Sequence, residues 1–258
     1  MRRLLCAGVA WAAWTMTEAR LELLGQAPSA RPLPVITAIT PLAVAPGEKT
    51  TLRILGANLA TARQILFPGT SLAPIPVKER KAAELPKGFE MKEAGETQLE
   101  IVLDLTQQTL TGSLPVAIQC ESARSDTLTL PVRSGSTQTS EKEPNNAFGE
   151  ANPISAGIPV LGSIQSEKDT DVYSFHPTVG EQYEAAITAT GRASLLDGSL
   201  AVYDADLRLV ISADDTRGAD PLVRFLVSRP GPHFLVVTDA ADKGGAWSPY
   251  ELLLSKLP

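Results

Sequence analysis

Hydrophobic and polar residues alternate in short runs along most of the chain, and turn-forming or charged residues separate one run from the next. A period of two residues, bounded by Gly, Pro or Asn, is typical of a β-strand with one buried face. In the first half, the runs lie at residues 35–41, 50–56, 62–67, 97–104, 112–120 and 127–132. In the second half, they lie near residue 164 and at residues 172–175, 182–188, 199–203, 209–212, 222–227, 233–238 and 250–254. The pattern predicts an all-β protein.

A polar stretch separates these two groups of strands. Residues 134–140 are small or polar throughout, which is typical of a linker. We expect an immunoglobulin-like β-sandwich over residues 34–133, because short strands separated by turns favour that fold. About eight strands within residues 141–258 favour a second, jelly-roll-like β-sandwich. Residues 78–96 mix charges of both signs, so we expect an exposed hairpin or a short helix there.

The N-terminus has the pattern of an export signal. Residues 1–3 carry two arginines, and the apolar run over residues 4–14 is too short to span a bilayer. Residues 1–27 are therefore expected to be a signal peptide and lead-in, with cleavage after Ala19 or Ala27. Because the rest of the sequence lacks a transmembrane pattern, we expect export to the periplasm, the cell surface or the extracellular space.

Charge is distributed unevenly along the chain, whose net charge is −6. Residues 31–140 hold 11 basic and 10 acidic side chains, whereas residues 141–258 hold 9 basic and 17 acidic ones, a net charge of −8. Phosphate binding needs a basic face, so this acidity argues against a nucleic-acid partner. It fits cation binding or, alternatively, a solvated acidic surface.

Short motifs follow one another in residues 141–258. The segment opens with Glu-Pro-Asn-Asn at residues 143–146, and an Asp-x-Asp pair at Asp169 and Asp171 precedes Tyr173 and Phe175. Further motifs lie at residues 180–183, 202–204, 214–215, 230–234 and 250–252. Over residues 141–258 the chain resembles the bacterial pre-peptidase C-terminal domain, a secreted β-sandwich accessory module. The resemblance implies binding or supporting work outside the cell rather than catalysis.

One position of the second half departs from the family pattern, and the first half has a family resemblance of its own. The pre-peptidase C-terminal family usually has an aromatic residue where His233 stands, a role that Phe234 is expected to take. A strand ending in proline, a Gly-Ala-Asn-Leu turn at residues 56–59 and a Phe-Pro-Gly turn at residues 67–69 resemble the start of an IPT/TIG immunoglobulin-like domain. We therefore assign residues 34–133 to that type of sandwich.

The pre-peptidase C-terminal resemblance also implies a calcium site. In calcium-binding members, acids and amides of the opening segment approach the acids before the Tyr-x-Phe strand, and Ca²⁺ takes six to eight oxygen ligands. The candidate ligands are Glu141, Glu143, Asn145, Asn146, Asp169 and Asp171. The alternative is a structural turn in which the asparagine side chains bond to the backbone. Asp214 and Asp215 form either a second site or a solvated turn.

The sequence offers little for catalysis. It contains two histidines, His176 and His233, and its serines lack the Gly-x-Ser-x-Gly pattern of a nucleophile elbow. Zinc-type His and Cys spacings are also missing. Once the signal containing Cys6 is removed, Cys120 is alone and is expected to be a buried strand residue. We therefore expect a protein that is not an enzyme and has no catalytic residues.

Trp247 is the candidate ligand-binding residue, because it lies in a glycine-rich loop and exposed aromatics are common stacking platforms. The alternative is that Trp247 folds back to cover the edge of the core beside Tyr250. The function expected from the sequence is that of an exported accessory protein that recognises an extracellular polysaccharide or protein, with calcium as a stabilising ion. The alternative is a structural spacer of the cell envelope or secretion apparatus.

Overall fold

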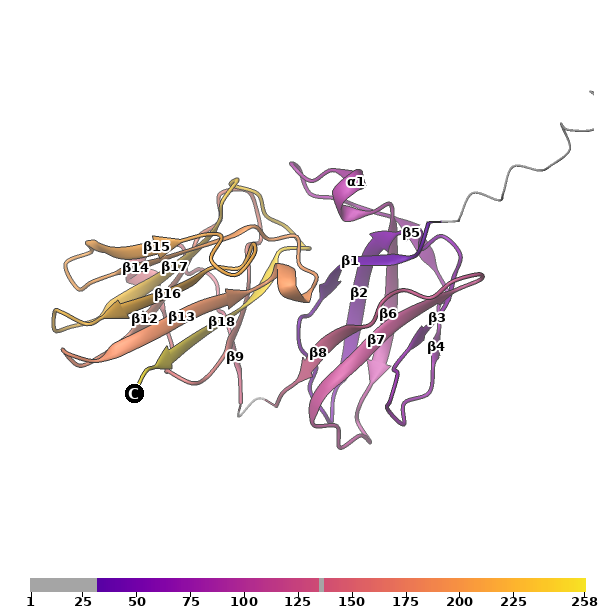
Figure 1. Cartoon of the computed structure of the whole chain (residues 1–258), viewed down its shortest axis with the longest axis horizontal. Coiled ribbons are helices and arrows are strands. Elements are labelled where there is room, and N and C mark those ends of the chain that lie inside the picture. Colours follow the sequence, from indigo (N-terminus) through magenta and orange to yellow (C-terminus); the bar gives the residue numbers. More distant parts are fainter. Residues whose placement is uncertain (1–31, 135–136) are drawn as a thin grey trace, which may run out of the picture. The chain divides into compact units, whose positions relative to one another are not determined.

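A computed structural model describes residues 32–134 and 137–258 of the chain (Figure 1). The predicted signal peptide and lead-in, residues 1–27, lie outside the described residues. Residues 33–258 form one compact unit. Among the described residues, none of the helices has the length and hydropathy needed to cross a bilayer.

Two four-stranded sheets are built from residues 35–132 (Figure 1). One sheet has the order β1-β2-β6-β5, with β1 at Val35–Thr40, β2 at Lys49–Ala57, β6 at Thr97–Asp104 and β5 at Arg80–Ala82. The other has the order β4-β3-β7-β8, with β4 at Ile75–Pro76, β3 at Ala62–Leu66, β7 at Gly112–Cys120 and β8 at Leu128–Val132. We name these two sheets the first sandwich. A one-turn helix, α1 at Met91–Ala94, connects β5 to β6.

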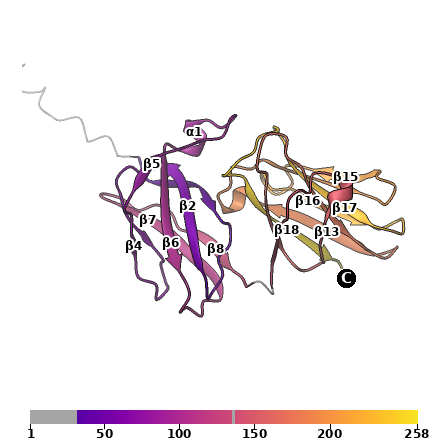
Figure 2. The ribbon, with the colours of Figure 1, turned by 180° about the vertical axis from the view of Figure 1, so that it is seen from behind.

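The second sandwich consists of two five-stranded sheets, whose strands can be followed from behind in Figure 2. One sheet has the order β10-β12-β17-β14-β15, with β10 at Asn152–Pro153, β12 at Asp171–Phe175, β17 at His233–Asp239, β14 at Gly198–Tyr203 and β15 at Leu209–Ala213. The other has the order β16-β13-β18-β11-β9, with β16 at Leu222–Leu226, β13 at Gln182–Thr188, β18 at Pro249–Lys256, β11 at Val160–Ser163 and β9 at Thr139–Ser140. Short 3₁₀ turns lie at Phe148–Glu150 (η1) and Thr190–Arg192 (η2).

Alternation along the strands explains the two cores. In β6, Leu99, Ile101 and Leu103 are buried, whereas Glu100 and Val102 between them face solvent. Side chains of a strand point to opposite faces in turn, so each strand contributes one apolar face to its core. The same rule places Asp171, Tyr173 and Phe175 on one face of β12, which is the face turned into the second core.

The predicted all-β class and the β-sandwich architecture are confirmed, and every predicted alternating run contains a strand, apart from the run near Ile164. That run is displaced, because its strand β11 ends at Ser163. The two-residue strands β4, β9 and β10 were missed, since two residues show no period. Residues 78–96 contain both a strand, β5, and a short helix, α1. The domain boundaries at residues 34–133 and 141–258 stay predictions.

Gly95 is a position where the backbone leaves no room for a side chain. Its φ is +89°, and a Cβ there would overlap the carbonyl carbon of Gly56. Gly95→Ala is therefore expected to lower the free energy of unfolding by about 3 kcal/mol, combining φ strain with a backbone clash. Urea denaturation of the full chain would measure the loss.

Gly112 provides the matched control for Gly95. It has a similar φ of +78°, but no heavy atom lies within 4 Å of the position that a Cβ would take. Gly112→Ala is expected to cost only the backbone strain, about 1 kcal/mol. Equal losses at the two positions would contradict the role assigned to the contact with Gly56.

Candidate metal centre

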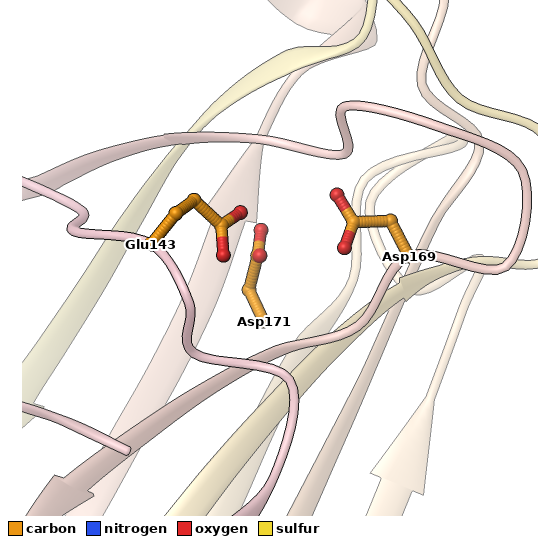
Figure 3. Close-up of side chains that lie close together, drawn as sticks. All are labelled: Glu143, Asp169 and Asp171. Carbon is orange, nitrogen blue, oxygen red and sulfur yellow. The ribbon is translucent and has the colours of Figure 1, made fainter. Parts of the chain in front are cut away.

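Three acidic side chains from separate stretches of sequence meet at one end of the second sandwich. Glu143 lies in the segment that leads to η1, Asp169 lies in the loop between β11 and β12, and Asp171 begins β12. One carboxylate oxygen from each comes within 4.8 Å of the others. Figure 3 shows the three carboxylates turned toward the same space. We name this set the acidic cluster.

The segment carrying Glu143 is tied to the sheet next to it. The backbone N of Val172 donates to Asn145 O at 2.9 Å, which places the segment beside β12. Phe148 then packs edge-on against Tyr203 and Phe234, with ring centroids 5.3 and 5.1 Å apart. These contacts fix Glu143 at the start of β12 although the segment itself has little regular structure.

Asp169 is oriented by the turn that contains it. Its Oδ2 accepts a hydrogen bond from Gln165 N at 2.6 Å, and its Oδ1 accepts one from Thr170 N at 3.0 Å. Lys168, just before it, has a φ of +61°, which reverses the chain. The backbone donors leave the remaining lone pairs of the carboxylate free to face the cluster.

The amides of Asn145 and Asn146 have two orientations with different consequences. With nitrogen turned to the cluster, Asn145 donates to Glu143 Oε2 at 2.9 Å and to Asp171 Oδ1 at 3.1 Å. Asn146 likewise donates to Thr170 O at 3.0 Å and to Asp169 Oδ1 at 3.2 Å. With oxygen turned to the cluster, the same positions add two amide oxygens to the three carboxylates. The first orientation is a hydrogen-bonded turn, and the second is an all-oxygen ligand set.

Glu141 lies beside this group and forms a side-chain hydrogen bond with Asp171. It accepts hydrogen bonds from Ser163 N at 2.9 Å and from the Tyr173 hydroxyl at 3.2 Å. The hydroxyls of Tyr173 and Tyr250 are 2.6 Å apart, and Tyr250 donates to Asp171 Oδ2. Glu141 therefore interacts with Asp171 both directly and through the two phenols, although its carboxylate lies outside the acidic cluster.

Burial changes the acid–base properties of this network. It raises the pKa of the Asp171 carboxyl to about 8, and the neighbouring Glu141 carboxylate adds to the rise. Burial also raises the pKa of Glu141 and of the phenols of Tyr173 and Tyr250. A cation beside Asp171 would offset this effect, because opposite charge stabilises the ionised carboxylate.

At low calcium, the free energy of unfolding is expected to fall as the pH rises from about 4 to about 8. The folded state holds the Asp171 proton in this window because its pKa is raised to about 8, whereas the unfolded chain releases it near the ordinary value of 3.8. The native state thus binds more protons, and this contribution is lost as the pH rises through the folded pKa. Urea denaturation in a chelator across this range would measure the slope.

Asp171→Asn is the control for this pH dependence, because its side chain keeps the size of Asp171 and cannot titrate. The variant is expected to give a flatter profile than the natural chain over the same pH range. Equal slopes in the two proteins would contradict the assignment to Asp171.

Sequence reasoning and the structure differ on several site residues. The structure brings together five of the six metal candidates, and Glu141 adjoins them as a hydrogen-bond partner of Asp171 outside the acidic cluster. Asp214 and Asp215 lie elsewhere, in an exposed turn where Asp214 Oδ1 accepts from Asp215 N at 2.8 Å. The roles of Tyr173 and Tyr250 were missed, because alternation predicts that both point inward but not that their hydroxyls meet.

Trp247 is buried, so the expectation of an exposed stacking platform was wrong. Its exposed fraction is 1%, and its Nε1 donates to Glu84 O at 3.3 Å. This agrees with the alternative that the indole folds back onto the protein. The bulky apolar ring gains more from a closed pocket than from solvent, because burial of apolar surface is favourable.

The chemistry of the acidic cluster fits a hard cation. Three carboxylates, two side-chain amides and the Thr170 carbonyl provide oxygen atoms. Six oxygen donors match the lower end of the range that Ca²⁺ takes, whereas Zn²⁺ prefers nitrogen and sulfur ligands. Glu143, Asn145, Asn146, Asp169 and Asp171 are the side chains that would hold such an ion.

Comparisons with known proteins give partial matches. No protein-family model matches the chain. A stretch of 99 residues, 37% of the chain, is 33% identical to a probable subtilase-type serine protease of Deinococcus radiodurans, and it covers 14% of that protein's length. The chain therefore spans only a small part of this relative.

Among solved structures, the chain is similar to the pre-peptidase C-terminal domain of a collagenase from Bacillus anthracis, with 19% identity and a TM-score of 0.34 over 45% of the chain and 100% of that domain. It is also similar to PliG of Aeromonas hydrophila, a periplasmic inhibitor of g-type lysozyme, with 14% identity and a TM-score of 0.34 over 47% of the chain and 98% of PliG. A pre-peptidase C-terminal domain, the type of module that residues 141–258 resemble, is thereby among the solved structures similar to the chain.

Proposed function

We propose that this chain is a calcium-stabilised, non-catalytic accessory module of an exported protein. The observation that carries the proposal is the convergence of Glu143, Asp169 and Asp171, whose carboxylate oxygens come within 4.8 Å of one another. Three negative charges at this spacing repel one another unless a proton or a cation lies among them. An all-oxygen set of this kind is the one that Ca²⁺ prefers.

The three acids would tie separate parts of the second sandwich to one ion. Glu143 comes from the opening segment, Asp169 from the loop before β12, and Asp171 from β12 itself. Calcium supplies positive charge that offsets their mutual repulsion. Because the unfolded chain does not hold these side chains together, binding would favour the folded state by mass action.

The accessory role rests on the motifs of residues 141–258 and on the nature of the relative. The motifs resemble a secreted module that accompanies peptidases, and the relative is a probable subtilase-type protease. Two potential catalytic side chains are in unsuitable surroundings. His233 is buried with its Nδ1 3.3 Å from Gly231 O, and burial raises the pKa of the Cys120 thiol. An extracellular polysaccharide or protein is the expected partner.

A structural spacer of the cell envelope or secretion apparatus is the second candidate. The burial of Trp247 favours it, because this indole has no free face on which a sugar ring could stack. Sedimentation of the full chain with insoluble polysaccharides and with fibrous protein separates the two candidates. Retention on one of them favours the accessory role, and failure to bind any of them favours the spacer.

Calorimetric titration of the chelator-treated full chain with CaCl₂ tests the calcium proposal. We expect a saturable heat with one ion per chain, and we expect Asp169→Asn to weaken or abolish it. Asp214→Asn is the matched control, since Asp214 is an exposed acid outside the acidic cluster. A flat titration, or equal binding by Asp169→Asn, would refute the site.

A further inference from the structure

Residues 83–96 of the first sandwich form a surface segment that we name the strap. The strap includes α1 and is closed at its base by a hydrogen bond from Ala83 N to Glu96 O at 3.0 Å. The Thr37 hydroxyl on β1 donates to Ala94 O, which anchors the strap to the first sandwich. Both alanines are buried, with exposed fractions of 8% for Ala83 and 0% for Ala94. The charged segment therefore has a buried apolar face.

The partner of that face is Trp247 from the loop before β18. The indole belongs to a small hydrophobic cluster shared by the two sandwiches. Its buried neighbours there are Ala38, Leu55, Ala83 and Ala94. The Trp247 Nε1 donates to Glu84 O of the strap at 3.3 Å, and the Arg53 guanidinium lies 5.7 Å from the ring centroid. One side chain of the second sandwich thus occupies a pocket built by the first.

Charged groups on the strap extend the same contact. Lys87 pairs with Glu167 of the second sandwich at 3.0 Å. In the opposite direction, Lys243 of the second sandwich places its Nζ 5.3 Å from the ring centroid of Phe89. Exposed pairs of this kind add little stability, so the strap depends mainly on its buried contacts.

Backbone hydrogen bonds hold the loop that carries Trp247 against the loop between β11 and β12. Gly245 N donates to Ile164 O at 2.8 Å, and Lys168 N donates to Asp242 O at 3.1 Å, which ties the loop before β18 to the loop before β12. A Cβ on Gly245 would overlap Pro86 Cγ, so the strap and this loop touch closely. The loop is therefore held in place to present the indole.

Further contacts join the sandwiches away from the strap. Ile39 N of β1 donates to Ala193 O, just after η2, at 2.8 Å. Glu251 of β18 lies 3.0 Å from both Arg133, which follows β8, and Arg192 of η2. These contacts and the strap join the same two bodies.

We propose that the strap is a clamp that joins the two sandwiches into one cooperative folding unit, with Trp247 as the side chain on which the joint depends. A polar linker alone would let each sandwich unfold separately. A shared apolar cluster changes this, because opening it exposes the indole and its pocket to water. The inference is independent of calcium and assigns the charged segment at residues 83–96 a partner within the chain.

Hydrogen–deuterium exchange tests the clamp on the full chain. Protein equilibrated across a urea series is pulse-labelled, and mass spectrometry reports the unfolding midpoint of peptides from β6 and from β13 separately. We expect one common midpoint in the natural chain. Trp247→Ala, on one side of the clamp, and Ala94→Asp, on the other, are each expected to split it into two midpoints.

Met91→Asp is the matched control, because Met91 lies on the same short helix as Ala94 but has an exposed fraction of 57%. It is expected to keep the common midpoint. Separate midpoints in the natural chain would overturn the proposal. So would a single midpoint retained in both Trp247→Ala and Ala94→Asp, or a split as large in Met91→Asp as in those variants.

Discussion

Trp247→Ala is expected to lower the free energy of unfolding by about 4 kcal/mol. The ring is 1% exposed and contacts residues of both sandwiches, so its removal leaves a large buried cavity. The variant also leaves Glu84 O without its indole donor. The pulse-labelled urea series described above would measure the loss for each sandwich, since the two sandwiches of this variant are expected to unfold separately.

Trp247→Phe is the control for this prediction. A phenyl ring fills part of the cavity but cannot donate to Glu84 O, so its loss is expected to be roughly half that of alanine. A loss below about 1 kcal/mol for Trp247→Ala would show that the indole can leave its pocket at little cost, and it would contradict the role of Trp247 as a packed anchor.

Glu251→Ala is expected to destabilise the protein by about 3 kcal/mol, because it leaves two arginines facing each other without their shared acid. The Glu251 side chain is 4% exposed, and Arg133 and Arg192 each place a guanidinium nitrogen 3.0 Å from its Oε2. Removing one member of a buried ion group costs far more than the group itself contributes. Urea denaturation at constant ionic strength would measure the effect.

Glu184 is the matched control for Glu251, since it also pairs with an arginine and lies on the same sheet. Its partner Arg224 is 67% exposed and Glu184 itself is 24% exposed, so solvent reaches this pair more than it reaches Glu251. Glu184→Ala is expected to cost less than about 1 kcal/mol. If Glu184→Ala and Glu251→Ala lower the free energy of unfolding equally, the burial of Glu251 is not the cause of its effect.

Strand positions could be predicted from the sequence because each strand keeps one apolar face over several residues. Leu99, Ile101 and Leu103 are buried and alternate with exposed positions, which are polar apart from Val102, and that pattern is local. Strands such as β9, with two residues, carry no such signal and depend on neighbours that are far away in sequence. The pairing of β9 with β11 therefore could not be predicted.

The acidic cluster was likewise predictable from the sequence only in part. The resemblance of residues 141–258 to a pre-peptidase C-terminal domain made Asp169 and Asp171 candidates from the sequence. Whether Glu141 or Glu143 reaches them depends on how the opening segment crosses the sheet. The structure brings Glu143 to the cluster, whereas Glu141 forms a hydrogen bond with the Asp171 carboxyl beside it, and the Tyr173 and Tyr250 hydroxyls contact the same two acids.

The clamp shows why the prediction of an exposed segment at residues 78–96 was incomplete. Lys87, Glu90 and Lys92 are exposed, as mixed charges predict. The small side chains Ala83 and Ala94 carry no strong pattern, yet they line the pocket of Trp247. A glycine-rich loop around a tryptophan is equally compatible with a free platform and with an anchor, and only the partner surface distinguishes them.

Thermal melting of the full chain at neutral pH, with saturating CaCl₂ and with a chelator, tests the calcium-stabilised module most directly. We expect calcium to raise the melting temperature by about 5 °C or more, since a ligand that binds the folded state adds stability by mass action. Asp171→Asn should abolish the shift, and Asp214→Asn should retain it. Identical melting curves with calcium and with chelator would contradict the calcium site and leave residues 143–146 as a hydrogen-bonded turn.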